Sequence, residues 1–413
     1  MTQEVIQTSR LDAEQAVNEI CSKLKKAKSA YTAIIFFASI EYDFKKLSEL
    51  LKENFPQAEV VGSSTAGEIT ADGFTKRSLV VNALADSGSV RTQFSGVLLE
   101  DANNFPIVYK DDIIKAASAI GISLSSAGIS RNSFAMTFIC GLLNAEEIVL
   151  SVLYSLVKDS DFLTAGGSAG DDMRFQKTLV SYNGKVSDMG AVILFVKTTG
   201  KFTIYKENIF QPSGKHVMLT QVDPEKHIIS SIDGQNPKKR YAQVLGINEA
   251  NVANALLDHP FGRVFGNEVF IASLVQFDMA GKLTTYARVL QNSVQEILEP
   301  VDVLNTAENS CKDVLEEIKN PGCVILFNCI LRTVGFEKHN QQASVNSVWK
   351  KYFPTYSGFS TYGEQFGHIN SNQTLVVLAM ESERQNYGTI HRTTARKGAK
   401  RFGCLSHHSL LNV

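Results

Sequence analysis

A seven-residue pattern, G-x-S-T-x-G-E, occurs twice in the chain, as GSSTAGE at 62–68 and as GFSTYGE at 358–364. Before the first copy, TAIIFFAS at 32–39 predicts a buried strand, and DFKKLSELLKENF at 43–55 predicts a helix with Asp43 as its N-cap. A second apolar run, AEVVG, then leads into the motif, and the second copy has the same lead-in. A strand, a helix and a strand in this order predict parallel strands joined by a helical crossover.

A third, degenerate copy lies between these two. SFAMTFIC at 133–140 predicts its first strand, NAEEIVLSVLYSLVKD at 144–159 its helix, and DFLTA the strand before GGSAGDD at 166–172. Other apolar runs, such as GAVILFV at 190–196, predict antiparallel additions, and two runs flanking 279–281 predict a hairpin. We therefore expect an α/β fold with mixed α+β sheets, built from repeated strand–helix–strand–loop units.

The repeated loops are the first candidates for a ligand site. Loops at the carboxyl ends of parallel strands commonly bind ligands, and small or hydroxyl-bearing residues let a ligand approach and bond to the backbone. One such loop alone is more simply a tight turn with a capping acid. Matched copies favour loops that line a shared pocket. The candidates are Gly62, Ser64, Thr65, Gly67 and Glu68 in the first copy, Gly166, Ser168, Gly170 and Asp171 in the degenerate copy, and Gly358, Ser360, Thr361, Gly363 and Glu364 in the last.

Composition favours a globular protein and gives no sign of a nucleic-acid-binding or membrane protein. The chain has 413 residues, 44% of them apolar, and a formal net charge of −1, so it can bury a large core and gives no reason to expect a nucleic-acid surface. No apolar run reaches membrane-spanning length, and the N-terminus does not have the pattern of a signal peptide. The six cysteines are scattered without a C-x-x-C pair, which indicates reduced thiols and a cytoplasmic location.

At this point the residues resemble a known family. VVGSSTAGEIT and GGSAGDD resemble the N-terminal module of the FIST family of sensory proteins, and HPFG at 259–262, FNCILR at 327–332, STYGEQ at 360–365 and NQTLVVLAM at 372–380 resemble its C-terminal module. The resemblance implies an N-terminal helix at 1–30, a first module at 31–208, a second at 209–387 and a basic, mobile tail at 388–413. The boundary is expected at IFQPSGKHV (209–217), where Pro and Gly interrupt the pattern.

The GEQ form and the stand-alone architecture look most like the nitric-oxide-sensing branch of the family. That resemblance implies non-covalent haem b, a diatomic ligand and a histidine kinase or related signalling partner. Whether the chain forms a homodimer stays open. No kinase segment is visible in the sequence, so output would pass to a separate protein.

Haem would need an axial ligand and a cation for its propionates. His368, four residues after Glu364, and His259, beside a Pro-Gly turn, are the leading axial candidates, although each could be structural. Arg332 is the candidate cation, although it could instead form a salt bridge at the surface. Cys329, Tyr356 and Tyr362 are weaker candidates for ligating ferric haem.

Two other classes of function remain open. The first is a haem-free sensor of small organic ligands such as amino acids, using the same loops. The second is a hydrolase, because Gly166–Gly170 satisfies G-x-S-x-G, with Ser168 as nucleophile. That pattern needs a helix directly after the serine, and strand-like sequence follows instead. We therefore expect that the chain is not an enzyme.

Overall fold

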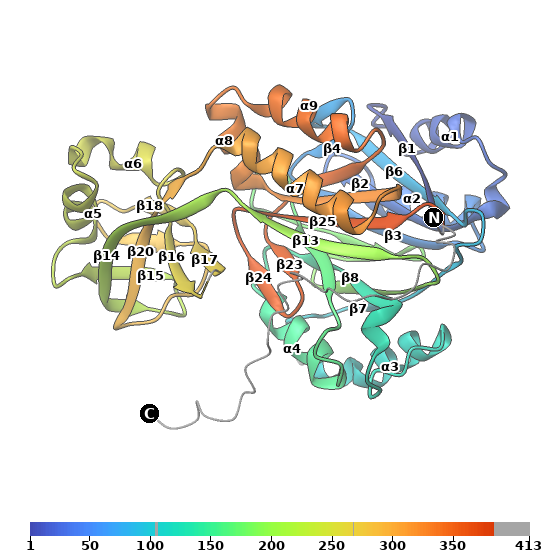
Figure 1. Ribbon diagram of the computed structural model, residues 1–413, viewed down its shortest axis with the longest axis horizontal. Coiled ribbons are helices and arrows are strands. Elements are labelled where there is room, and N and C mark those ends of the chain that lie inside the picture. The colour runs from blue at the N-terminus through green and yellow to red at the C-terminus, as the bar shows by residue number, and fades with distance from the viewer. Residues whose placement is uncertain (104–105, 267, 384–413) are drawn as a thin grey trace, which may run out of the picture.

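The repeat predicted from the sequence is present three times in the computed structural model, which describes residues 1–103, 106–266 and 268–383. The predicted tail at 388–413 lies outside the described residues. Units one and two have the order strand, helix, strand, helix and four further strands, and unit three has two helices, α8 and α9, in place of the second helix (Figure 1). Unit one comprises β1 (Thr2–Thr8), α1 (Ala13–Lys23), β2 (Tyr31–Ser39), α2 (Phe44–Asn54), β3 (Glu59–Thr65), β4 (Glu68–Thr70), β5 (Gly73–Thr75) and β6 (Leu79–Ala85).

Unit two repeats the order of unit one, and unit three extends it. Unit two comprises β7 (Thr92–Leu99), α3 (Lys110–Ala119), β8 (Ser133–Cys140), α4 (Glu146–Leu156), β9 (Thr164–Ala169), β10 (Val180–Tyr182), β11 (Lys185–Ser187) and β12 (Ala191–Thr198). Unit three comprises β13 (Phe202–Asn208), α7 (Val303–Glu317), β21 (Pro321–Cys329), α8 (Ile330–Lys338), α9 (Gln342–Tyr352), β22 (Ser357–Thr361), β23 (Glu364–Phe366), β24 (Ile369–Ser371) and β25 (Thr374–Glu381). The fold is thus a mixed α/β fold with several mixed sheets, as predicted.

Between β13 and α7 the chain forms a separate lobe, drawn in olive and yellow in Figure 1. A seven-stranded sheet packs there against two helices around a core that includes Leu219, Tyr241 and Phe261. The predicted hairpin around 279–281 joins two of its strands. The elements of the lobe are β14 (Phe210–Asp223), β15 (Ile228–Ile232), α5 (Pro237–Leu245), α6 (Val252–Ala255), β16 (Phe261–Phe265), β17 (Glu268–Ala272), β18 (Leu274–Phe277), β19 (Leu283–Thr285) and β20 (Ser293–Pro300).

The three units exchange hairpins in a closed ring. The hairpin β4–β5 of unit one completes the sheet of unit three, β10–β11 of unit two completes that of unit one, and β23–β24 of unit three completes that of unit two. In each sheet the exchanged hairpin lies next to the second strand of the parallel pair, β3, β9 or β22. None of the three sheets is therefore made by one unit alone.

The core lies where the three sheets face one another. Phe37, Phe138 and Phe327 occupy the same position in β2, β8 and β21, two residues before each strand ends. The ring of Phe138 lies 6.4 Å from that of Phe37 and 6.0 Å from that of Phe327, and Phe359 packs 4.7 Å from Phe37. The helices cover the outer faces of the sheets with separate apolar clusters. This burial is the main stabilising term for such a fold.

Two segments at the predicted domain boundaries form strands, and at 1–30 this corrects the prediction of a helix alone. Residues 1–30 begin with strand β1, which pairs with β6 and precedes the predicted helix. The ammonium group of Met1 donates to the carbonyl of Glu381 at 2.7 Å, so β1 also joins unit one to unit three. The segment 209–217 continues as strand β14, because Pro212 and Gly214 lie at a bulge in its pairing with β20.

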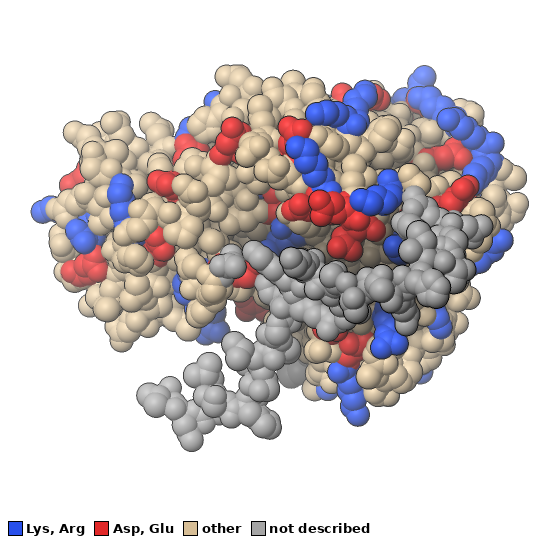
Figure 2. Space-filling model, viewed as in Figure 1, with Lys and Arg blue, Asp and Glu red and all other residues tan. Residues whose placement is uncertain are grey.

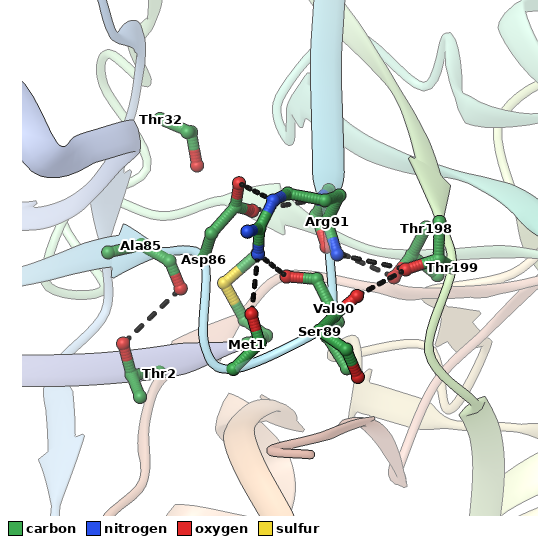
Figure 3. A network of polar contacts seen from close by, with 12 residues as sticks. Met1, Thr2, Thr32, Ala85, Asp86, Ser89, Val90, Arg91, Thr198 and Thr199 are labelled. Atoms are coloured by element: carbon green, nitrogen blue, oxygen red, sulfur yellow. Dashed lines mark hydrogen bonds and ion pairs between the residues drawn. The ribbon is translucent and has the colours of Figure 1, made fainter. Parts of the chain in front are cut away.

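Arg91 fixes the junction between units one and two (Figure 3). Its guanidinium donates to the carbonyls of Gly88 at 2.8 Å and Val90 at 3.1 Å and lies 3.7 Å from the carboxylate of Asp86. Its backbone N–H donates to Thr199 Oγ1 at 2.9 Å. The loop between β6 and β7 is therefore tied to the end of β12.

Charged side chains of both signs are interspersed over most of the face drawn in Figure 2, with basic side chains denser around α1. Among the helices that the structure describes, none combines the length and apolar character that a membrane crossing requires.

Candidate functional site

The three repeated loops meet at the centre of the ring and bond to one another in pairs. Between units one and two, Ser64 Oγ donates to the carbonyl of Gly170 at 2.7 Å, and the Gly170 N–H donates to the Ser64 carbonyl at 3.0 Å. Between units two and three, the Ser168 N–H donates to the Gly363 carbonyl at 2.8 Å and the Tyr362 N–H to the Ser168 carbonyl at 3.0 Å. The Ser360 N–H donates to the Gly67 carbonyl at 2.8 Å and so closes the ring. The loops converge, but their polar groups are largely used to hold one another.

The first glycine of each loop is required by the spacing of the parallel strands. A Cβ at Gly62 would lie 2.0 Å from the ring of Phe36, one at Gly166 2.1 Å from Thr137 Oγ1, and one at Gly358 2.1 Å from the Leu326 carbonyl oxygen. In each case the blocking residue is the register partner on the neighbouring parallel strand. The repeated glycine is thus explained by packing.

Glu68 and Glu364 occupy matching buried positions. Glu68 accepts from Thr65 Oγ1 and from the N–H and hydroxyl of Ser78, and Glu364 accepts from Thr361 Oγ1 and from the N–H and hydroxyl of Thr374. Both are 0% exposed. Burial raises the pKa of each carboxyl to about 8. The repeated acid therefore has the same local role twice, in the core and away from solvent.

Unit two lacks this acid. In the exchanged hairpins of units one and three, the acids Glu68 and Glu364 pair with Phe359 and Gly167 of the neighbouring sheets. At the matching position, the hairpin of unit two has Val180, which pairs with Ser63. Asp171, which the pattern matched to the acid, begins a longer loop instead. This longer loop contributes Met173 and Phe175 to the surface of unit two.

A cleft of about 600 Å³ opens where unit two, unit three and the inserted lobe meet. Its walls come from the loop before α4, from the segment that follows β9, from the hairpin β23–β24, from the first turn of α8 and from the lobe. Of the residues predicted for binding, Tyr362 and Cys329 line it. The other lining residues include Leu143, Asn144, Glu146, Glu147, Met173, Phe175, Glu225, His227, Ile271, Tyr286, Ala287, Arg288, Asn370 and Asn372. The cleft lies at the carboxyl ends of β8 and β21, where α/β folds usually bind ligands.

Glu146 connects this cleft to the repeated loop of unit two. It is the first residue of α4 and is only 7% exposed, although it lines the cleft. Its Oε1 accepts from Ser168 Oγ at 2.7 Å, and Ser168 Oγ accepts from Gln365 Nε2 at 3.0 Å. Burial raises the pKa of the Glu146 carboxyl. Gln365 Nε2 also donates to Asn370 Oδ1 at 2.9 Å, so a polar chain runs from the core to the cleft wall.

The histidines predicted to hold haem iron do not line this cleft. His368 is exposed in the turn between β23 and β24, with its ring 5.8 Å from that of Tyr154. The Nδ1 of His259 bonds to the Leu298 carbonyl at 3.1 Å. His227, which was not among the predicted axial ligands, does line it. Among the described residues, no group of three or more His, Cys, Asp or Glu side chains is arranged to hold a metal ion.

The weaker candidates for iron are no better placed. Burial raises the pKa of the Cys329 thiol well above its ordinary value, which disfavours the thiolate that binds iron. The hydroxyl of Tyr362 donates to Asp171 Oδ1. Tyr356 is buried on the far side of β22 and bonds to Asn346. The residues predicted for haem therefore do not form an iron site at the cleft.

Arg332 is neither a surface residue nor a free cation. It forms an ion pair with Glu207 in which the two side chains are 0% and 1% exposed. Its Nε donates to Asn328 Oδ1 at 2.9 Å, Asn328 Nδ2 donates to Thr333 Oγ1 at 2.9 Å, and Thr333 Oγ1 bonds to Ser360 Oγ at 2.8 Å. Arg332 thus fastens α8 to the repeated loop of unit three.

Ser168 is not placed as a hydrolase nucleophile. Its side chain is 0% exposed and bonded to Glu146 and Gln365. After β9 the chain turns through a loop to strand β10, so the helix that a nucleophile elbow requires does not follow.

Two family models match the chain: the FIST N domain over residues 32–235 and the FIST C domain over residues 238–367. No curated protein sequence is similar to it at a significant level. Solved structures that match the chain include a cyanuric acid hydrolase from A. caulinodans, with 10% identity, a TM-score of 0.34 and coverage of 92% of this chain and 99% of that one. A second cyanuric acid hydrolase has 10% identity, a TM-score of 0.32 and the same coverage, and PurLQS from Thermotoga maritima has 10% identity, a TM-score of 0.19 and coverage of 92% and 72%.

These matches correct one expectation. The sequence suggested that the chain is not an enzyme, but the first solved structures that it resembles are hydrolases. At this level of similarity the likeness assigns no reaction to the chain.

Proposed function

Because the chain is composed of a FIST N domain followed by a FIST C domain, we propose that it is a sensor whose small organic ligand binds in the cleft between unit two, unit three and the inserted lobe. FIST domains are sensory ligand-binding domains. The observation that carries the site is the buried carboxyl of Glu146, which lines the cleft and, among the described residues, has no cationic partner. A cleft of about 600 Å³ falls within the usual range for small-molecule sites.

Signal output would follow from closure of the cleft. The ligand would contact both the lobe and the ring, so binding would favour one arrangement of the two over the other. Gln373 joins them by accepting from Ser273 Oγ at 2.7 Å and donating to the Leu257 carbonyl at 2.9 Å. We infer that a partner protein, such as the histidine kinase implied by the resemblance, reads this arrangement.

The site can be tested by filling the cleft. In a thermal-shift screen of amino acids, amines and small carboxylates, we expect at least one compound to raise Tm, because a ligand that binds only the native state stabilises it by about 2.7 kcal/mol at 100 times its Kd. Calorimetry should then give 1:1 binding that Ala287→Trp weakens at least about tenfold by occupying the cleft.

Ala253→Trp is the matched control, since Ala253 is exposed on α6 and does not line the cleft. It should leave binding unchanged. Equal loss of affinity in both variants, or unchanged affinity in Ala287→Trp, would place the ligand elsewhere.

Haem-based nitric oxide sensing stays a prediction from the sequence resemblance. The histidine that lines the cleft is His227, not His368 or His259. If the prediction holds, the purified protein should retain haem b with a Soret band that shifts with nitric oxide. His368→Ala should then lose more haem than His339→Ala, and equal retention would remove His368 as the axial ligand. No retained haem would contradict the prediction and leave the organic-ligand proposal intact.

A further inference from the structure

The segment after β9 forms a strained loop at the rim of the cleft. Asp172, Met173 and Phe175 have φ angles of 55°, 61° and 52°, in the left-handed region that side chains other than glycine rarely adopt. Such conformations cost energy and persist only where the surrounding contacts impose them, often at functional sites.

A dense set of hydrogen bonds imposes this conformation. The carboxylate of Asp171 accepts from the backbone N–H groups of Phe175 at 2.9 Å, Gln176 at 2.6 Å and Lys177 at 3.0 Å. The hydroxyl of Tyr362 donates to the same carboxylate and accepts from the Met173 N–H at 2.9 Å. The loop is thus fixed from two units of the ring.

The fixed loop presents apolar side chains to the cleft. Met173 is 41% and Phe175 53% exposed, and both line the cleft. The ring of Phe175 stacks on that of Tyr362, with centroids 5.4 Å apart and an interplanar angle of 20°. This stacked pair forms a flat aromatic surface that is partly open to solvent. The hydrogen bonds that fix the loop hold the ring of Phe175 in this exposed position.

The cleft is lined by more acidic than basic side chains. Among the described lining residues, Glu146, Glu147 and Glu225 are acidic, Arg288 is the one arginine, and Arg288 is already paired with Glu225 at 2.5 Å. Glu146 and the aromatic pair line the same cleft and are connected through Ser168, whose carbonyl accepts from the Tyr362 N–H and whose hydroxyl donates to Glu146. One serine therefore separates the buried carboxyl from the aromatic surface.

From this juxtaposition we propose that the ligand is an aromatic amine, with its ammonium group bonded to Glu146 and its ring stacked on the Phe175–Tyr362 pair. The inference rests on the proposed function and deepens it by naming the chemical class of the ligand. An ammonium group would complete the hydrogen bonding of the carboxyl, and aromatic faces also attract cations. A carboxylate ligand would instead be placed beside a buried acid.

Four probes test the proposal on the full chain by calorimetry at one pH and ionic strength. 2-Phenylethylamine and tryptamine carry both groups, 3-phenylpropionate replaces the ammonium by a carboxylate, and hexylamine lacks the ring. The two aromatic amines should bind at least about 30-fold more tightly than 3-phenylpropionate and about tenfold more tightly than hexylamine.

Two variants assign these differences to residues. Glu146→Gln keeps the size of the side chain but removes the carboxyl that would pair with the ammonium group, and should weaken aromatic amines about 30-fold without weakening 3-phenylpropionate. Phe175→Ala should weaken the aromatic amines about tenfold and leave hexylamine unchanged. Asp111→Asn is the control, since Asp111 is an exposed acid in the first turn of α3 outside the cleft.

The outcomes separate this inference from the proposed function. Equal affinity for the amine and carboxylate probes, measured on the unmodified chain, would overturn the proposal that the ligand is an aromatic amine. It would leave the cleft as a ligand site. The same conclusion would follow if no aromatic amine binds but other compounds of the screen bind and lose affinity in Ala287→Trp. Binding of aromatic amines that survives both Glu146→Gln and Ala287→Trp would overturn both.

Discussion

Replacing Gly358 by alanine should lower the free energy of unfolding by more than about 4 kcal/mol or prevent folding altogether. The new Cβ would lie 2.1 Å from the carbonyl oxygen of Leu326, a backbone atom held in the parallel pairing of β21 and β22. Because β22 also carries the exchanged hairpin β4–β5, it cannot shift without separating two units. Urea unfolding followed by the fluorescence of Trp349, which is buried on α9 and is the one tryptophan of the chain, measures the effect.

Gly335→Ala is the matched control. Gly335 lies in α8, and the nearest atom to an added Cβ is 4.0 Å away. Alanine should stabilise this helix by about 0.5–1 kcal/mol. If Gly358→Ala were as stable as this control, the packing explanation of the repeated glycines would be wrong.

Stability should fall as pH rises from about 5 to about 8, because of Glu68 and Glu364. In the unfolded chain these carboxyls lose their protons near the ordinary value of 4.5, whereas burial raises the pKa of each to about 8 in the native state. Over this interval the native state binds more protons than the unfolded state, so the free energy of unfolding decreases with pH. The stabilisation is complete below about pH 4.5, and its loss by pH 8 amounts to at most about 5 kcal/mol for each carboxyl.

The double variant Glu68→Gln/Glu364→Gln should make this profile less steep, since an amide does not titrate. Urea unfolding at intervals between pH 5 and 8.5 gives the comparison. Glu53→Gln, a change at an exposed position on α2, should leave the slope unchanged. A profile as steep in the double variant as in the parent chain would show that other groups cause the dependence.

The units of the fold were predictable because their signals are local. Apolar runs, the N-cap Asp43 and the repeated glycine motif lie within single strand–helix–strand segments, and Asp43 does accept from the Lys46 N–H at 3.1 Å. The exchange of hairpins was not predictable, since β4–β5 is short and nothing in its sequence specifies the sheet whose edge it joins. Strand β1 is polar in sequence and becomes a strand through long-range partners, among them Val324, which donates to Gln3 Oε1 at 3.0 Å.

The candidate site was predicted less well, for a related reason. Tyr362 was found because it lies within the repeated motif. Glu146 was missed because an acid in the first turn of a helix usually has a solvated role at the helix dipole, and only the packing of unit three over α4 makes it a buried wall of the cleft. Phe175 was missed because left-handed backbone at residues other than glycine has no sequence signal.

The ring of exchanged hairpins also constrains how the protein is made. The hairpin Glu68–Thr75 leaves the ribosome well before its partner strand Ser357–Thr361, which lies in the third unit of the chain. Until then the edge of this hairpin is exposed, as is the edge of β9 that later pairs with β23–β24, and unpaired edges favour aggregation. Nascent chains of this protein should therefore depend on chaperones until the strands of unit three have emerged, and neither family-defined half should mature alone.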